Sequence, residues 1–407
     1  DGELAELMNI VRGRRSVRRY DGARVSKETL KRVARVVDHA PGFGGRRCWK
    51  FFVAGDERLV RGLISACGTG LRSSINPWLR APGIPAFVVA CARPGLSGRS
   101  RDRHFYVSDT SVAMEFLVLS AWENGLGTCW IGAFEEEPVK RALGHDGGFR
   151  VVAVSPLGYP MRRTPKALDL AGQYDRYAVE RMHKRRLPQR EILSRNVYGR
   201  RFELPCAPGG APGAVEGGAG SAAGRGETLL SLVKGVRFAK AFSGRAVEDW
   251  KIGAMVEAAR LAPSASNAQP WRFILVDDDR TKERLESAAW DDDGLPVPFA
   301  SAPVVIAAVA TEESLIRMRG EQQPYYLIDV PIALSHVMLA ASSLGVALNL
   351  SFVFSEKKVK EILRIPARCR VVALVAAGYP TARKGGDAFP LQYFSASAPG
   401  KSTFTVV

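Results

Sequence analysis

A cluster of arginines near the start of the chain is the first group of residues that could bind a ligand. Residues 14–20 read R-R-S-V-R-R-Y, which places four guanidinium groups and the hydroxyl of Ser16 within seven residues. Arginine binds phosphate through paired hydrogen bonds, so this cluster is typical of an oxyanion site. A second basic run, K-R-R-L-P-Q, occupies residues 184–189. By composition alone, a solvated basic face or a nucleic-acid patch explains both runs equally well.

The chain lacks the sequence patterns of several common catalytic sites. Its histidines form no H-E-x-x-H pattern and no close pair, so we expect no metal site. The acidic runs 277–279 and 291–293 lack an EF-hand frame. No G-x-S-x-G elbow is present, and no G-x-G-x-x-G follows a predicted strand. We therefore predict neither a metal nor a catalytic side chain.

Composition limits the environment and the partners of the chain. The 407 residues are 46% hydrophobic and carry a formal net charge of +17, which favours anionic partners. Aromatic residues do not alternate with the basic ones, so we do not expect nucleic acid as a partner. The cysteines are scattered, which is typical of free thiols in a reducing compartment. The longest apolar stretch, 333–354, contains His336 and Asn349, so we expect a cytoplasmic protein without a membrane span.

The elements that would position the basic runs occur twice in the sequence. Apolar residues at helical spacing follow Ser26 and stop at an Ala-Pro pair, because the residue before proline is pushed out of the helical region. The second copy of this helix covers residues 250–261. The remaining expected elements are two long buried helices (109–124 and 329–344) and six strands (50–54, 86–91, 151–157, 272–276, 303–309 and 371–377). Helices and strands mixed in this way predict an α+β fold.

Sequence landmarks support an internal repeat. Residues 40–49 and 262–271 share Ala, Pro and Trp at an offset of 222, and the G-Y-P tripeptides at 158–160 and 378–380 match at an offset of 220. Between the copies, residues 206–227 are rich in glycine and alanine, which is typical of a flexible tether. We therefore expect a first domain at 1–205, a linker at 206–227 and a second domain at 228–407.

Several of these motifs together resemble the FMN-dependent nitroreductase family, over nearly the whole chain and in both copies. The family opening R-R-S-x-R-x-[FY] corresponds to residues 14–20, and A-P-S-x-x-N-x-Q-P-W to residues 262–271. The turn G-L-G-T-x-W-I-G is found at 125–132, and the basic tail before Leu-Pro at 184–188. The resemblance implies two nitroreductase-like domains that form a pseudo-dimer within one chain, with mixed sheets flanked by helices.

The resemblance also implies that the two copies have degenerated in complementary ways. The first copy keeps the arginine cluster, the turn and the tail, but has Gly45 where the loop asparagine belongs. The second copy keeps the loop, but its cradle is V-R-F-A-K-A-F at 236–242 and its turn is altered at 345–352. The intact halves would form one FMN site per chain across the domain interface.

Family analogy assigns the cofactor-binding residues. The expected set is Arg14, Arg15, Ser16, Arg18, Asn76, Trp130, Ile131, Gly132, Lys184, Arg186, Pro263, Ser264 and Asn267. Basic residues and Ser16 would hold the phosphate, the turn backbone would approach the flavin ring, and the second-copy loop would close the other side. Asn76 is equally well explained as an ordinary loop residue before Pro77. Trp49 and Trp271 are expected to be core anchors.

The implied activity is electron transfer from NAD(P)H (NADH or NADPH) through FMN to a small electron-poor acceptor such as a nitroaromatic or a quinone. No side-chain acid or base is needed for this transfer. Two alternatives stay open: a flavin enzyme with a dehydrogenase or flavin-cleaving outcome, and a non-catalytic protein that sequesters FMN. Because one chain would hold both halves of the interface, a monomer is expected.

Overall fold

The structure of the chain is a computed structural model. It describes residues 2–42, 47–68, 76–100, 103–144, 148–161, 186–205, 227–290, 297–311, 324–381 and 404–406. Lys184, and the predicted linker except Glu227, lie outside these described residues.

The first half of the chain supplies most of one five-stranded sheet. Its strand order is β14-β1-β2-β6-β5, with β1 and β2 antiparallel, β2 and β6 antiparallel, and β14 parallel to β1. The bounds are β1 Trp49–Ala54, β2 Ala86–Ala92, β5 Gly127–Thr128, β6 Arg150–Gly158 and β14 Phe404–Val406. Every residue of β2 is buried, as expected for a continuous apolar run with both faces covered.

The second half supplies most of a sheet with the same design. Its order is β11-β13-β10-β8-β7, so the two sheets correspond strand for strand. The bounds are β7 Leu193–Arg195, β8 Trp271–Val276, β10 Val304–Ala310, β11 Ala347–Ser351 and β13 Arg370–Gly378. The six strands predicted from the sequence are confirmed, each to within one residue at either end.

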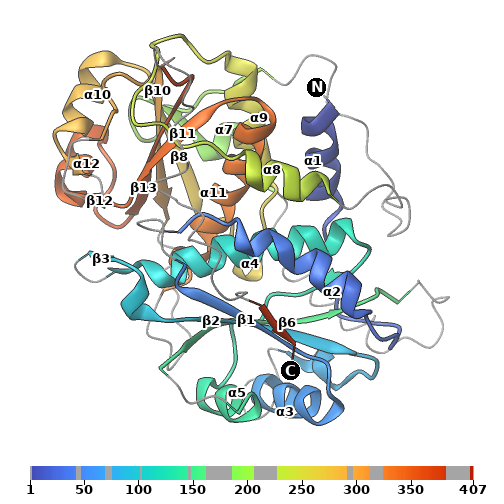
Figure 1. Cartoon of the computed structure of the whole chain (residues 1–407). Coiled ribbons are helices and arrows are strands. Elements are labelled where there is room, and N and C mark those ends of the chain that lie inside the picture. Colours follow the sequence, from blue (N-terminus) through green and yellow to red (C-terminus); the bar gives the residue numbers. More distant parts are fainter. Residues whose placement is uncertain are drawn as a thin grey trace.

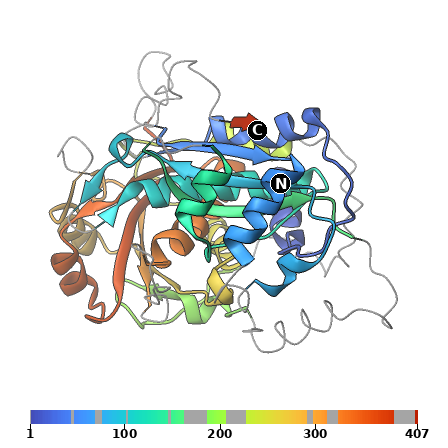
Figure 2. The same ribbon diagram turned by 90° about the horizontal axis from the view of Figure 1, so that it is seen from below.

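The two halves exchange their outermost strands. β7 comes from the first half but pairs in parallel with β8 of the second sheet. β14, at the end of the chain, pairs in parallel with β1 of the first sheet, and Figure 2 shows this red strand beside the blue strands. Each sheet is therefore completed by the other half of the chain. The sequence analysis did not predict this exchange.

Helices fill the space between the two sheets (Figure 1). The long helices α4 (Phe105–Glu123) and α11 (Tyr326–Ser343) pack against each other, and α9 (Asp249–Arg260) packs on α11. α1 (Gly2–Gly13) and α8 (Thr228–Gly235) contact both α4 and α11, and α2 (Lys27–Ala34) contacts α4. One hydrophobic core contains side chains from both halves. The predicted α+β fold is confirmed.

Both long helices start before the predicted residue and end two residues before a matched glycine. Asp329 lies in the first turn of α11 and Asp109 just after the first turn of α4, because buried apolar residues extend each helix toward its N-terminus and no side chain caps either start. At the other end, Gly125 and Gly345 adopt φ values of +76° and +66°. The left-handed conformation ends each helix and favours glycine. α11 is the one described helix long and apolar enough to cross a membrane, and it is mostly buried within the protein.

Shorter helices cover the outer face of each sheet (Figure 1). α3 (Glu57–Gly68) and α5 (Glu136–Ala142) lie on the first sheet, and α10 (Asp279–Glu286) and α12 (Glu356–Leu363) on the second. Glu136 and Glu356 bind the arginine that opens β6 and β13, at 2.9 and 3.1 Å. The remaining described α-helix and strands are α7 Gln189–Ile192, β3 Arg99–Ser100, β4 Arg103–His104, β9 Ala289–Trp290 and β12 Val353–Phe354.

Candidate functional site

The arginine cluster lies in an extended segment that runs beside the 125–132 turn. Ser16 forms a parallel bridge with Thr128, and the amide of Val17 donates to the Thr128 carbonyl at 2.8 Å. The close approach requires glycine at 127, because a Cβ there would lie 2.6 Å from the Cβ of Val17. The structure therefore brings together the predicted phosphate cradle and the predicted flavin turn.

Arg14 is the buried member of the cluster. The residue is 8% exposed, and its Nε has no hydrogen-bond partner among the described residues. Burial lowers the pKa of Arg14, an effect that the negative charge of Glu115 opposes and the nearby Arg15 reinforces. Arg15 itself is exposed and donates to the carbonyls of Arg12 and Arg14. A buried cation with an unused donor is a ready contact for an anion.

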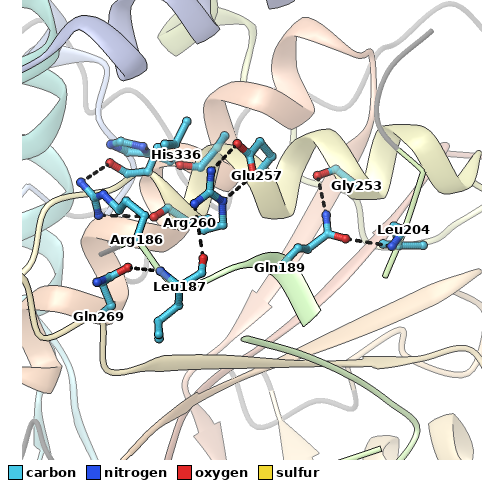
Figure 3. A network of polar contacts seen from close by, with 11 residues as sticks. Arg186, Leu187, Gln189, Leu204, Gly253, Glu257, Arg260, Gln269 and His336 are labelled. Carbon is cyan, nitrogen blue, oxygen red and sulfur yellow. Dashed lines mark hydrogen bonds and ion pairs between the residues drawn. The ribbon is translucent and has the colours of Figure 1, made fainter. Parts of the chain in front are cut away.

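The basic tail reaches the second half of the chain through Arg186 (Figure 3). Its guanidinium donates to the carbonyls of Arg260, Leu261 and Ala262 at 3.3, 3.0 and 2.5 Å. The positive charge of Arg186 also interacts favourably with the negative, C-terminal end of the α9 helix dipole. Burial lowers the pKa of Arg186 to about 10, and the neighbouring Arg14 contributes to the same shift. Arg186 therefore lies close to the cradle and joins the tail to the start of the second-copy loop.

The second-copy loop is held in an uncommon backbone conformation. Ser266, Asn267 and Gln269 all have positive φ, at +49°, +51° and +49°. The amide of Gln269 donates to the Ser264 hydroxyl at 2.9 Å, and the Gln269 side chain accepts from the amide of Leu187 at 2.8 Å. Positive φ in residues other than glycine costs free energy and persists where surrounding contacts impose it. The loop is thus fixed by its own hydrogen bonds and by the first-half tail.

Asp329 of α11 holds this loop through a hydrogen bond to its backbone. Its Oδ1 accepts from the amide of Ala265 at 3.0 Å, whereas Oδ2 has no partner among the described residues. Burial raises the pKa of Asp329 to about 7, and the Ala265 hydrogen bond opposes this shift. Asp109, at the matching place in the first half, instead accepts a hydrogen bond from Ser97 at 2.7 Å.

The turn at 129–132 contacts both halves of the chain. The amide of Ile131 donates to Val154 of β6 at 2.8 Å. The indole of Trp130 donates to Glu115 of α4 at 3.1 Å. A Cβ on Gly132 would lie 2.8 Å from the ring of Tyr325, at the start of α11. The predicted ring-facing backbone is therefore placed directly against the second half.

Asn76 has structural partners in this fold. Its side-chain amide donates to the carbonyls of Cys67 and Ala133, at 3.0 and 3.1 Å, and the residue is buried. Ala133 directly follows the 129–132 turn, although it is 57 residues from Asn76 in the sequence. Asn76 therefore supports the turn, and its contact with a flavin stays a prediction.

The structure brings the arginine cradle, the turn and the described part of the tail close to one another and to the start of the second-copy loop. The cradle meets the turn, the tail meets the second-copy loop, and the turn meets α11. At the pseudo-symmetric place, Phe238 bridges to Leu348 in the same way as Ser16 to Thr128, but the first-copy loop at 43–46 lies outside the described residues. Trp49 and Trp271 are buried, as predicted.

Sequence analysis missed four residues that organise this site. Gln269 lies within the quoted loop motif but was not singled out, and Tyr325 carries no pattern of its own. Glu115 and His336 are fully buried ionisable residues near the middle of two very apolar helices. That contrast was the available signal, because an ionisable side chain is rarely fully buried without a partner.

Two sheets that share one helical layer, each completed by a strand from the other half of the chain, define a fused two-domain α+β protein. The family model described as the nitroreductase family matches residues 11–159, 236–292 and 295–379, which are more than half of the chain and fall in both halves. The chain belongs to the nitroreductase family.

Individual relatives match either one half or nearly the whole chain. A candidate NADH dehydrogenase/NAD(P)H nitroreductase from Archaeoglobus fulgidus is 28% identical over 185 residues, covering 44% of this chain and 98% of that protein. An iodotyrosine deiodinase from Haliscomenobacter hydrossis is 26% identical over 167 residues, covering 35% of this chain and 75% of that protein. A crystal structure of a candidate nitroreductase from Anabaena variabilis covers 88% of this chain and 90% of its own, with a TM-score of 0.57 at 16% identity. This last likeness concerns the fold alone.

Proposed function

We propose that this chain is an FMN-dependent oxidoreductase that passes electrons from NAD(P)H to a small electron-poor acceptor of the nitroaromatic or quinone type. The family assignment and the names of the relatives support an NAD(P)H-dependent oxidoreductase. The observation that carries the proposal is the position of Arg186, which donates to the Ala262 carbonyl at the start of the loop and lies close enough to Arg14 for the two charges to interact.

The residues present fit the phosphate end of FMN. Arg14 is buried with an unused Nε donor, and it lies near enough to Arg186 for its charge to lower the pKa of Arg186. A dianionic phosphate would relieve this repulsion and accept several charge-assisted hydrogen bonds. Ser16 is exposed beside them and offers its hydroxyl.

In the proposed site, the two halves of the chain have different tasks. Arg14, Arg15, Ser16, Arg18 and Arg186 would hold the phosphate, together with Lys184. The backbone of residues 130–132 would line the ring, and Pro263, Ser264 and Asn267 would close the opposite side. When bound, FMN supplies the hydride-accepting chemistry, so the protein provides position and electrostatics without a side-chain acid or base.

Anaerobic reduction tests the proposal. Protein reconstituted with FMN is mixed with NADH or NADPH while the visible absorbance of the flavin is followed. We expect bleaching with at least one nicotinamide, then recovery of the absorbance when a quinone or nitroaromatic is added. Absence of bleaching with both donors would contradict the oxidoreductase proposal. Bleaching without turnover of any acceptor would favour a protein that sequesters FMN.

A further inference from the structure

A chain of buried hydrogen bonds joins the two halves of the protein directly behind the 129–132 turn. The indole of Trp130 donates to Glu115 Oε2 at 3.1 Å, and Glu115 Oε1 lies 3.0 Å from Nε2 of His336. The other ring nitrogen of His336, Nδ1, lies 3.0 Å from the carbonyl of Ala258 on α9. Glu115 on α4 and His336 on α11 have no exposed surface. Figure 3 shows His336 beside the Arg186 network.

The geometry determines how many hydrogen atoms the linked side chains of Trp130, Glu115 and His336 must carry. The carbonyl of Ala258 can only accept, so Nδ1 of His336 carries a hydrogen. The Trp130 indole is also a donor, so the contact between Glu115 and His336 needs one further hydrogen. Either a carboxylic acid faces a neutral imidazole, or a carboxylate faces an imidazolium. Without that hydrogen, two lone pairs would face each other in the interior, which is costly.

The polar chain exists on one side of the pseudo-symmetric interface only. At the offset of 220 that relates the long helices and the turns, Glu115 corresponds to Ser335, and Trp130 to Leu350. His336 corresponds in the same way to Phe116. The Ser335 hydroxyl donates to a carbonyl within its own helix at 2.7 Å, and Phe116 is fully buried. The series of hydrogen bonds is therefore present beside the intact cradle and absent beside the degenerate one.

We propose that Glu115 and His336 are positioning residues. By sharing a hydrogen across the α4–α11 contact, they hold the indole of Trp130, and with it the backbone of residues 130–132, where the flavin ring is bound. The inference rests on the proposed function and adds that domain two sets the shape of a turn that belongs to domain one. Val154 anchors Ile131 from the sheet side, so the Glu115 contact fixes the other side of the same turn.

Two substitutions at Glu115 separate position from charge. Glu115→Gln keeps all three hydrogen bonds, because its oxygen accepts from Trp130 and its amide donates to a neutral His336. Glu115→Leu has a similar volume but leaves the Trp130 donor and the His336 acceptor unpartnered. Trp130→Phe removes the donor alone and serves if the leucine variant fails to fold. Ser335→Ala, at the corresponding place on α11, is the matched control.

The first readout is FMN affinity, measured by titration of the flavin-free full chain. We expect Glu115→Gln and Ser335→Ala to stay within about threefold of wild type, and Glu115→Leu and Trp130→Phe to bind about tenfold more weakly. The double variant Glu115→Leu/Trp130→Phe should bind no more weakly than either single one, because both act through one contact. Equal effects of Gln and Leu, or unchanged affinity in all variants, would overturn the proposal.

The second readout needs no flavin, so it separates failure of this inference from failure of the proposed function. Hydrogen exchange of the Trp130 indole N–H is followed by NMR of the tryptophan-labelled protein. We expect slow exchange in wild type and in Glu115→Gln, and exchange at least tenfold faster in Glu115→Leu. Equal rates in all three would overturn the positioning role, even if the wild type binds FMN. If the wild type binds no FMN, the proposed function fails and the positioning role falls with it.

Discussion

At the scale of single residues, the site consists of charges that the fold buries with incomplete partners. Arg14 has a buried Nε without a partner among the described residues, and Asp329 has an Oδ2 in the same condition. Both lie beside segments that the sequence motifs assigned to cofactor binding. Buried polar groups without partners lower the stability of a protein, so their presence here is typical of a binding site rather than of a core.

We therefore expect Arg14 to strengthen FMN binding and to lower the stability of the flavin-free protein. We expect Arg14→Gln to raise the melting temperature of the flavin-free protein by a few degrees, because it removes a desolvated charge and its repulsion with Arg186. The same variant should bind FMN about 10- to 100-fold more weakly, since it loses charge-assisted hydrogen bonds. Thermal melts and FMN titrations measure both effects, with the exposed Arg24→Gln as the control of equal charge. Equal FMN affinities in the two variants would refute the role of Arg14.

Asp329 predicts a dependence of stability on pH. Its pKa is about 7 in the folded protein and about 4 in the unfolded chain. Between these values the folded state holds a proton that the unfolded state has released, so stability falls as the pH rises from about 4 to about 7. Asp329→Asn keeps an acceptor for the amide of Ala265 and cannot titrate.

We expect Asp329→Asn to gain about 2.5 kcal/mol in unfolding free energy relative to wild type when the pH changes from 5 to 8. Urea unfolding of the flavin-free protein at both pH values gives this difference. Glu283→Gln, at an exposed carboxylate, should show no such gain. The account of Asp329 is wrong if its asparagine variant and the wild type lose stability in parallel.

At the scale of elements, the contact between cradle and turn shows a compensation between the two halves. In the first half, Val17 faces Gly127, and a Cβ on the glycine would come within 2.6 Å of the valine Cβ. At the corresponding places in the second half, the chain has Ala239 and Ala347. The backbone contact is the same, since the Val17 and Ala239 amides each donate to the turn at 2.8 Å.

This compensation can be tested by exchange. We expect Gly127→Ala to lower the unfolding free energy by about 1–3 kcal/mol through overpacking. Adding Val17→Ala to that variant should recover most of the loss, because it recreates the Ala–Ala pair of the second half. Chemical denaturation of the single and double variants measures the recovery. A double variant less stable than Gly127→Ala would show that the contact does not set the spacing.

Elements were also the level at which sequence patterns predicted best. The six core strands are nearly continuous apolar runs bounded by turn residues, and each was placed to within one residue. The starts of α4 and α11 were placed too late, because no capping side chain marks them. β7 and β14 have three residues each and carry no periodic pattern, so their exchange between sheets could not be predicted.

At the scale of the whole molecule, one chain contains both sides of its own interface. The largest hydrophobic core of the described residues contains side chains from both halves, and one edge strand of each sheet comes from the other half. We propose a division at 1–205 and 228–407 with a linker between, and a monomer in solution, because the interface is already satisfied within the chain. The arginine cradle and the loop could be read from motifs, whereas the Glu115–His336 pair could not. Its members are 221 residues apart and meet only through the crossing of two helices.

The number of FMN molecules bound per polypeptide tests the central claim most directly. The chain is saturated with FMN, freed of excess by gel filtration, and denatured so that the released flavin is counted by its absorbance against protein concentration. The composite site on the Arg14 side predicts one FMN per chain in the wild type and a large loss in Arg14→Gln. Two FMN per chain, or one that persists undiminished in Arg14→Gln, would contradict the account.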